Sequence, residues 1–247
     1  MVPEAVRKQV RVANWTPRPL MYAPSLVGRH VRIDPLNVTR DVPLLWDALG
    51  GKRDDATGIN ERLKWYGMHD FEEEQDLADL LQQLEAPPGC CVNVFRIFDN
   101  NNSSTLLEDS TVAGMACYLG TRPEHGSTEV GCVAHGLAMA QTPAATEAHY
   151  LLAKHVFETM GYRRYEWKCN SQNLPSGASA LRYGFLYEGC FRQHVVTAKG
   201  HNRDTNWYSM IDAEWPQRKA AMEAWLSPEN FDENGKQKKG LQEYHTW

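Results

Sequence analysis

The sequence lacks several features that mark specialised classes of protein. Its six cysteines contain no C-x-x-C pair, and most of them fall in apolar runs typical of strands. We therefore expect free thiols in a reducing compartment, with no disulfide framework and no metal site. No stretch reaches about 18 consecutive apolar residues, and the charged N-terminus is unlike a signal peptide. These absences predict a cytoplasmic protein with no membrane contact.

The chain also lacks the basic excess of many nucleic-acid-binding proteins. It has 26 Lys and Arg against 31 Asp and Glu, a formal net charge of −5, so we expect no nucleic-acid partner. A content of 42% hydrophobic and 23% charged residues is typical of a soluble globular protein. Length and composition predict an N-terminal arm over 1–29, one domain over 30–215, and a C-terminal helix with a polar tail over 216–247.

Hydrophobic periodicity and turn residues predict strands and helices in irregular order. Strands are expected over 30–36, 90–99, 110–120, 127–136, 162–170, 189–200 and 204–215. Helices are expected over 40–51 with Asp41 as its cap, 69–85, 143–162, 173–185 and 216–226. Because the order lacks the strict alternation of a doubly wound sheet, we predict an α/β (α+β) fold with a mixed sheet and helices on both faces.

The segment EVGCVAHGLAMAQTPAATE, residues 129–147, leads from a strand through a tight loop into the longest predicted helix. The free N–H groups at a helix start attract anions, and the helix dipole adds to this attraction. The small side chains of Ala144 and Ala145 would let a phosphate approach the backbone closely. The alternative interpretation is an ordinary helix cap.

This segment resembles motif A of the GNAT acyltransferases, where Q/R-x-x-G-x-G/A holds the pyrophosphate of coenzyme A. In one register Ala140 takes the place of the Gln or Arg and Pro143 that of the first glycine, and in the other Gln141 fills the first position. The resemblance implies acetyl-CoA as cofactor. The cofactor-binding residues it implies here are Ala134, His135, Gln141, Thr142, Ala144, Ala145 and Thr146.

A second stretch, NLPSGASALRYGF at residues 173–185, resembles motif B of the ribosomal-protein N-acetyltransferase branch of that family. Asn173 would bind the pantetheine arm, and Ser176 would lie near the cofactor sulfur and protonate the leaving thiolate. The tyrosine that often acts as the acid is Ala180 here, so a bound water is the alternative acid. The alternative role for Asn173 and Ser176 is to cap the helix. The resemblance covers roughly residues 30 to 237 and implies the GNAT fold, with its mostly antiparallel sheet.

Acyl transfer to an amine requires a base for the amine and a donor that polarises the acyl carbonyl. Glu129 lies on the strand before the cofactor loop, in a position where many GNAT enzymes carry a glutamate, and Asp204 is the reserve base. The alternative for Glu129 is an exposed strand-end side chain. Backbone N–H groups near Ala134 and His135 are expected to polarise the carbonyl, at the point where the family's strand splays from its neighbour.

Trp65 and Tyr66 lie where this family builds a substrate wall, although such a pair also occurs in ordinary cores. The resemblance implies an N-acetyltransferase that transfers acetyl directly to a primary amine in a ternary complex, acting as a monomer or homodimer. The acceptor is expected to be a small molecule, and the alternatives are a protein N-terminus or a non-catalytic acyl-CoA-binding module. Glu129 would face the acceptor together with Trp65 and Tyr66.

Overall fold

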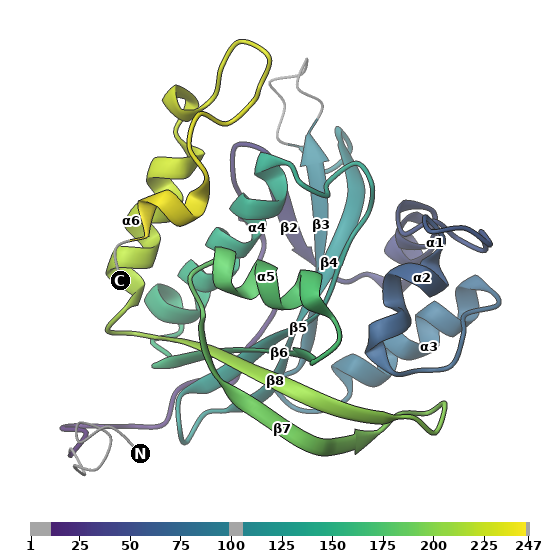
Figure 1. Ribbon diagram of the computed structural model, residues 1–247, viewed down its shortest axis with the longest axis horizontal. Coiled ribbons are helices and arrows are strands. Elements are labelled where there is room, and N and C mark those ends of the chain that lie inside the picture. The colour runs from purple at the N-terminus through teal and green to yellow at the C-terminus, as the bar shows by residue number, and fades with distance from the viewer. Residues whose placement is uncertain (1–10, 99–105, 246–247) are drawn as a thin grey trace.

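A computed structural model describes residues 11–98 and 106–245 and shows a single eight-stranded sheet (Figure 1). The strand order is β1-β2-β3-β4-β5-β6-β8-β7, and only the β5–β6 pair is parallel. The predicted mixed, mostly antiparallel sheet is therefore confirmed. The strands are β1 (Leu26–Val27), β2 (Val31–Pro35), β3 (Cys91–Phe98), β4 (Ser110–Arg122), β5 (Ser127–His135), β6 (Arg164–Asn170), β7 (Leu186–Val196) and β8 (Asn202–Ile211).

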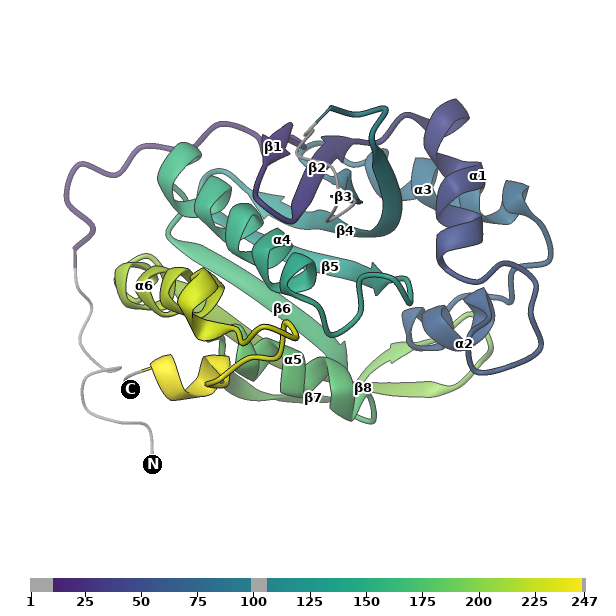
Figure 2. The same ribbon diagram turned by 90° about the horizontal axis from the view of Figure 1, so that it is seen from above.

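Helices cover both faces of the sheet, as predicted. Figures 1 and 2 show α1, α2 and α3 together on one side of the molecule and α4 and α6 on the other. The helices are α1 (Val38–Ala48), α2 (Ile59–Leu63), α3 (Glu74–Glu85), α4 (Pro143–Lys154), α5 (Leu174–Arg182) and α6 (Trp215–Leu226). Across residues 11–98 and 106–245, every helix falls short of the length and apolarity that a membrane crossing requires.

Two hydrophobic cores hold these layers together. One core joins α4, α5 and α6 to the sheet through fully buried side chains such as Leu152 and Ala180. The other joins α1, α2 and α3 to the opposite face through Leu45, Ile59 and Leu81. Side chains alternate between the faces of a strand, so each central strand contributes to both cores.

Three local features differ from the sequence predictions. Asp41 does not cap α1: Asn37 is the N-cap and accepts a hydrogen bond from the Arg40 amide at 3.0 Å. Helix α3 begins only at Glu74, because the Asp76 carboxylate binds the amides of residues 72 and 73 and fixes the start there. Strand β1 and helix α2 were not predicted, since each spans five residues or fewer and carries no periodic pattern.

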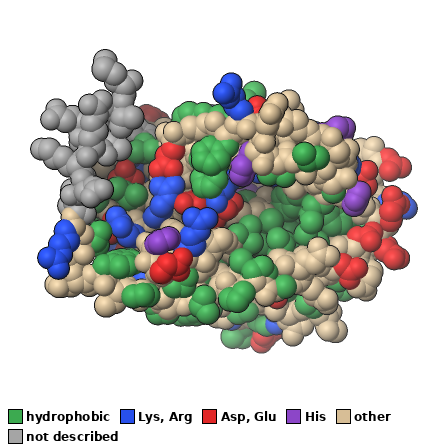
Figure 3. All heavy atoms as spheres, turned by 90° about the horizontal axis from the view of Figure 1, so that it is seen from below, with side chains coloured by type: hydrophobic (Ala, Val, Ile, Leu, Met, Phe, Trp, Pro, Cys, Tyr) green, Lys and Arg blue, Asp and Glu red, His purple; other side chains and the backbone are tan. Residues whose placement is uncertain are grey.

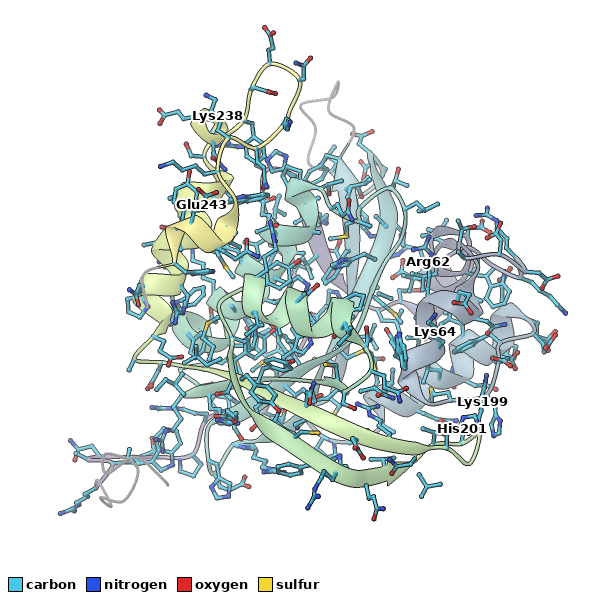
Figure 4. The ribbon with its side chains drawn as sticks, viewed as in Figure 1. Arg62, Lys64, Lys199, His201, Lys238 and Glu243 are labelled. Atoms are coloured by element: carbon cyan, nitrogen blue, oxygen red, sulfur yellow. The ribbon has the colours of Figure 1, made fainter. Side chains whose placement is uncertain are left out.

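The C-terminal segment after α6 folds back over the domain. Asn230 is buried at its centre, where its side-chain amide donates to the carbonyl of Trp225 at 3.0 Å and its side-chain oxygen accepts from the Lys239 amide. Leu241 is fully buried in the core with α6. Figure 4 shows Lys238 and Glu243 on this returning segment beside α6. The polar tail expected from composition is thus packed against the domain.

Candidate active site

The candidate site is built where β5 leaves β6. The two strands pair from Ser127 to Val130, opposite Arg164 to Trp167, and the pairing ends there. Beyond that point β5 carries a bulge against β4, with Cys132 in a left-handed conformation at φ 48°. A bulge bends its strand and redirects the neighbouring groups, so the rest of β5 lines a gap in the sheet.

The gap exposes a backbone amide of β5. The Gly136 amide donates to the Ala113 carbonyl on the β4 side at 2.7 Å. Because successive residues of a strand direct their amides to opposite sides, the His135 N–H points away from β4, into the gap. The His135 carbonyl, on the same side, accepts a hydrogen bond from Arg62 Nη1 at 3.2 Å. Of the two amides expected to polarise the carbonyl, that of His135 therefore faces the gap, whereas Ala134 faces β4 opposite Met115.

Three adjoining cavities run from this gap to the start of α4. The inner cavity, about 230 Å³, and the middle cavity, about 320 Å³, share walls made by Trp65, Tyr66 and Ser176. The middle cavity joins the outer cavity, about 630 Å³, at His135 and Tyr183. The structure thus brings together the predicted residues Trp65, Tyr66, Glu129, Asn173 and Ser176 in the inner cavity, and His135, Gln141, Thr142, Ala145 and Thr146 in the outer one.

Glu129 lines the inner cavity, and its carboxylate pairs with Lys168 Nζ at 2.7 Å. Lys168 also contacts Glu166 at 2.9 Å and lies over the ring of Trp207. Burial raises the pKa of Glu129 above its ordinary value, and the nearby Lys168 ammonium only partly offsets that effect. A carboxylate with a raised pKa holds a proton more firmly and is the stronger base.

The predicted motif B residues lie at the entrance of α5. Asn173 is the N-cap of the helix, and its side chain accepts from the Ser176 amide at 3.3 Å. The Ser176 hydroxyl accepts a hydrogen bond from Trp167 Nε1 at 3.0 Å. Gly184 ends the helix at φ 91°, as its position predicted. Both Asn173 and Ser176 line the inner and middle cavities, so the capping interpretation of Asn173 and a site role are compatible.

The loop before α4 leaves amides free at its helix end. Gln141 adopts a left-handed conformation at φ 63°, and the turn that follows is tied by the Thr142 hydroxyl, which donates to the Met139 carbonyl at 2.7 Å. Pro143 has no N–H, and the Ala145 amide donates to the Thr142 carbonyl. In the part of the chain that the structure describes, the amides of Gln141 and Ala144 have no backbone acceptor. Thr146 is the fourth residue of α4, where the regular helical hydrogen bonds begin. The start of α4 thus leaves two amides free in the segment where the sequence predicts an anion site.

Comparison with solved structures shows what this architecture is. A GCN5-related N-acetyltransferase from Brucella melitensis is 37% identical, with a TM-score of 0.82, and the match covers 95% of this chain and 99% of that one. A probable GNAT-family acetyltransferase from Chromobacterium violaceum is 31% identical, with a TM-score of 0.72, over 85% of this chain and 96% of that one. The chain belongs to the GCN5-related N-acetyltransferase family. The resemblance stated from motifs A and B is therefore confirmed at the level of the superfamily, and N-acetyltransferase activity follows in general terms.

The likeness to the ribosomal-protein branch is more distant. RimL, the ribosomal L7/L12 alpha-N-protein acetyltransferase, solved in complex with coenzyme A, is 17% identical with a TM-score of 0.56, over 76% of this chain and 98% of that one. At this identity the match shows a shared fold alone. No protein-family model and no curated protein sequence matches the chain.

Two cationic residues of this GNAT protein that sequence reasoning missed border the outer cavity. Arg182, at the end of α5, donates from Nη1 to the Thr146 hydroxyl at 3.0 Å, beside the free amides of α4. Lys236 reaches the same cavity from the C-terminal segment. Neither residue carries a local signal, because each is brought to α4 only by tertiary packing. Arg182 is held further by the ring of Trp225 at 4.9 Å.

The remaining candidate residues of this GNAT domain have other surroundings. The Asp204 carboxylate accepts from the Gln193 amide at 2.7 Å and from Asn202 Nδ2 at 2.9 Å, which fixes the irregular β7–β8 pairing, and Asp204 is not among the residues that line the inner cavity. Ala144 borders a neighbouring cavity on the other side of α4. Burial lowers the pKa of His135 to about 4, so its ring is neutral near pH 7.

Proposed function

We propose that the protein is an acetyl-CoA-dependent N-acetyltransferase that transfers acetyl to the primary amine of a small molecule. The observation that carries the proposal is the continuity of the three cavities. They connect the loop before α4, where the Gln141 amide is free, with the carboxylate of Glu129 through the gap beside His135. A long cofactor with an anionic end and a reactive end requires such an arrangement.

The residues at the α4 start fit the pyrophosphate of coenzyme A. Free amides at a helix N-terminus favour an anion, and Arg182 and Lys236 add positive charge on the facing wall. Asn173 would bind the pantetheine arm in the middle cavity. When bound, acetyl-CoA supplies the activated acetyl group. Gln141, Arg182 and Lys236 would hold its anionic end, and the inner cavity would be left for the acetyl group and the acceptor.

Three groups of the protein then serve the chemistry. Glu129 accepts the proton that the amine must lose, directly or through a water. The His135 N–H stabilises negative charge on the acyl oxygen, and Ser176 gives a proton to the departing thiolate. Direct transfer is supported by the lining of the same cavity: among the described residues it holds the thiols of Cys132 and Cys169 but no histidine that would activate either of them as a nucleophile.

A small acceptor is favoured by the size of the inner cavity, which is about 230 Å³. The tip of the β7–β8 hairpin docks on the loop after α2, where the Ala198 amide donates to the Gly67 carbonyl at 2.9 Å and Lys199 pairs with Asp70 at 2.5 Å. Figure 4 shows Lys199 and His201 at this tip, next to the segment that carries Arg62 and Lys64. The tip thus packs beside the segment of Trp65 and Tyr66, which line the inner cavity. A cavity of this size favours a small acceptor over an extended peptide.

The test is a mass-spectrometric screen of small amines and of peptides, with acetyl-CoA and the full chain. Acetylated small amines, with Glu129→Gln reducing turnover and leaving coenzyme A binding intact, would support the proposal. Glu124→Gln makes the same change on an exposed side chain and should keep full activity. Acetylation of peptides alone would replace the small molecule by a protein N-terminus, and no acetylation together with coenzyme A binding would indicate a non-catalytic module.

A further inference from the structure

The charged groups around the inner cavity are unequally paired. Its charged lining residues are Glu129, Lys168 and Arg203. Lys168 is neutralised twice over, by Glu129 at 2.7 Å and by Glu166 at 2.9 Å. Arg203 has no such partner. Its Nε donates to the Thr205 hydroxyl at 3.3 Å, and within the described residues no carboxylate lies within 4.0 Å of its guanidinium.

Arg203 lies at the end of the cavities that is remote from the start of α4. It projects from β8, and it borders the inner cavity but neither the middle nor the outer one. Of the three cavities, Glu129 likewise borders only the inner one. A molecule that places its amine at Glu129 therefore has Arg203 as the cation available to the rest of its structure.

We propose that the acceptor is a small amine that also carries an anionic group, a carboxylate or a phosphoryl group, which Arg203 binds while the amine faces Glu129. This inference rests on the proposed function and names its substrate class. Guanidinium binds both anions with paired hydrogen bonds, and these are among the stronger polar contacts in proteins. A cavity of about 230 Å³ has room for a molecule of amino-acid size. The N-terminus of a peptide lacks such an anion beside its amine.

A cationic acceptor such as a diamine is the rival, because acidic side chains surround the neighbouring cavity of about 380 Å³ beside α3. Figure 3 shows acidic side chains gathered at that end of the molecule. Asp70 pairs with Lys199, whereas Asp76 accepts from the two amides at the start of α3 and Asp79 accepts from Gln75 Nε2 at 2.7 Å. None of these three acidic residues borders the inner cavity, where Arg203 lies without a carboxylate partner.

The experiment compares acceptors that differ only in the anion. Steady-state rates of the full chain with acetyl-CoA are measured for amino acids, their carboxamides, aminoalkylphosphonates and diamines. We expect the KM of the carboxylate or phosphonate amines to be at least tenfold lower than that of the matched neutral amines. Arg203→Gln should raise this KM about tenfold, with little change in kcat and little change for carboxamides. Arg192→Gln, on the exposed face of the neighbouring strand, is the matched control and should leave all values unchanged.

The comparison of amino acids with aminoalkylphosphonates shows whether the anion is a carboxylate or a phosphoryl group. Arg203→Glu should shift the preference of the enzyme toward diamines. Calorimetry of the same amines with coenzyme A-loaded protein gives a readout that does not depend on turnover. Equal KM values for amino acids and carboxamides, or a preference of the unmodified protein for diamines, would overturn the inference while leaving the acetyltransferase proposal intact. Arg203-dependent binding of the anionic amines without acetylation would instead overturn the acetyltransferase proposal alone.

Discussion

The ammonium of Lys168 lies 2.7 Å from the carboxylate of Glu129, and each side chain is only 15% exposed. Burial nevertheless raises the pKa of Glu129, against the opposing effect of Lys168. Glu129 therefore holds a proton better than an exposed glutamate does, which is a property that a general base needs. The strength of Glu129 as a base depends on the balance between burial, which raises its pKa, and the Lys168 charge, which lowers it.

Replacing Glu129 by Gln should lower kcat about 100- to 10,000-fold, the range of general-base contributions. In the unmodified enzyme kcat should fall as the pH drops through the raised pKa of Glu129, because the protonated acid cannot accept the amine's proton. The measurement is a pH–rate profile of both proteins. If kcat of Glu129→Gln fell at low pH with the same midpoint as in the unmodified enzyme, another group would be responsible for the fall.

Replacing Lys168 by Met should move that acid limb to higher pH. The Lys168 charge lowers the pKa of Glu129, so its loss raises the pKa further, and a larger fraction of the enzyme is protonated at any given pH. The check is the midpoint of the kcat profile, with Lys219→Met on α6, whose ion pair with Glu158 lies outside the three cavities, as the control. A limb that stays in place would mean that the two side chains are not coupled.

Replacing Arg182 by Gln should weaken coenzyme A binding about 10- to 100-fold, the effect of losing a charge-assisted hydrogen bond of about 1.5–3 kcal/mol. The Arg182 guanidinium already donates to Thr146 beside the free amides. Isothermal titration with coenzyme A measures the change. Lys154→Gln, at the opposite end of α4, should bind normally, and equal affinities in all three proteins would remove Arg182 from the cofactor site.

Ser176→Ala should lower turnover about 100-fold if the hydroxyl is the general acid, with coenzyme A affinity nearly unchanged. Ser176→Ala also leaves the buried Trp167 Nε1–H without its acceptor, which should lower the free energy of unfolding by about 1–3 kcal/mol. Asn173→Ala removes the cap of α5 and should lower it by about 1 kcal/mol, without the loss of the acid. Rates and thermal melts of the two variants separate these roles, and unchanged turnover in Ser176→Ala would favour a bound water as the acid.

A buried ion cluster at α1 should make the free energy of unfolding depend on pH. Asp41 is fully buried and pairs with Arg40 at 2.6 Å and with Arg96. Burial alone would raise the pKa of Asp41, but the hydrogen bonds from Arg40 and the Asn37 amide outweigh it and lower the pKa. The stabilisation is thus complete above the unfolded-state pKa and is lost as the pH falls through the lower folded-state value. Asp41→Ala should cost about 3–5 kcal/mol, measured by urea unfolding at pH 7, and a loss below about 1 kcal/mol would contradict this account.

The sequence was informative where structure is local. The alternating strands and the starts of α4 and α5 were predicted within a few residues. Side-chain alternation and helix caps are determined by residues that are close together in the sequence. Asp41 was misread as a cap because its partner Arg96 lies 55 residues away. Arg182, Lys168 and Arg203 were missed for the same reason: each reaches the site through a strand register or a helix contact that no short pattern encodes.

The proposed cofactor site rests on one physical claim, that the free amides of Gln141 and Ala144 at the start of α4 bind the pyrophosphate of a thioester carrier. Titration calorimetry of acetyl-CoA into the full chain tests it directly, with Arg182→Gln in parallel. The account predicts saturable binding of one molecule per chain that weakens in the variant. A folded protein that releases no heat with acetyl-CoA would contradict it.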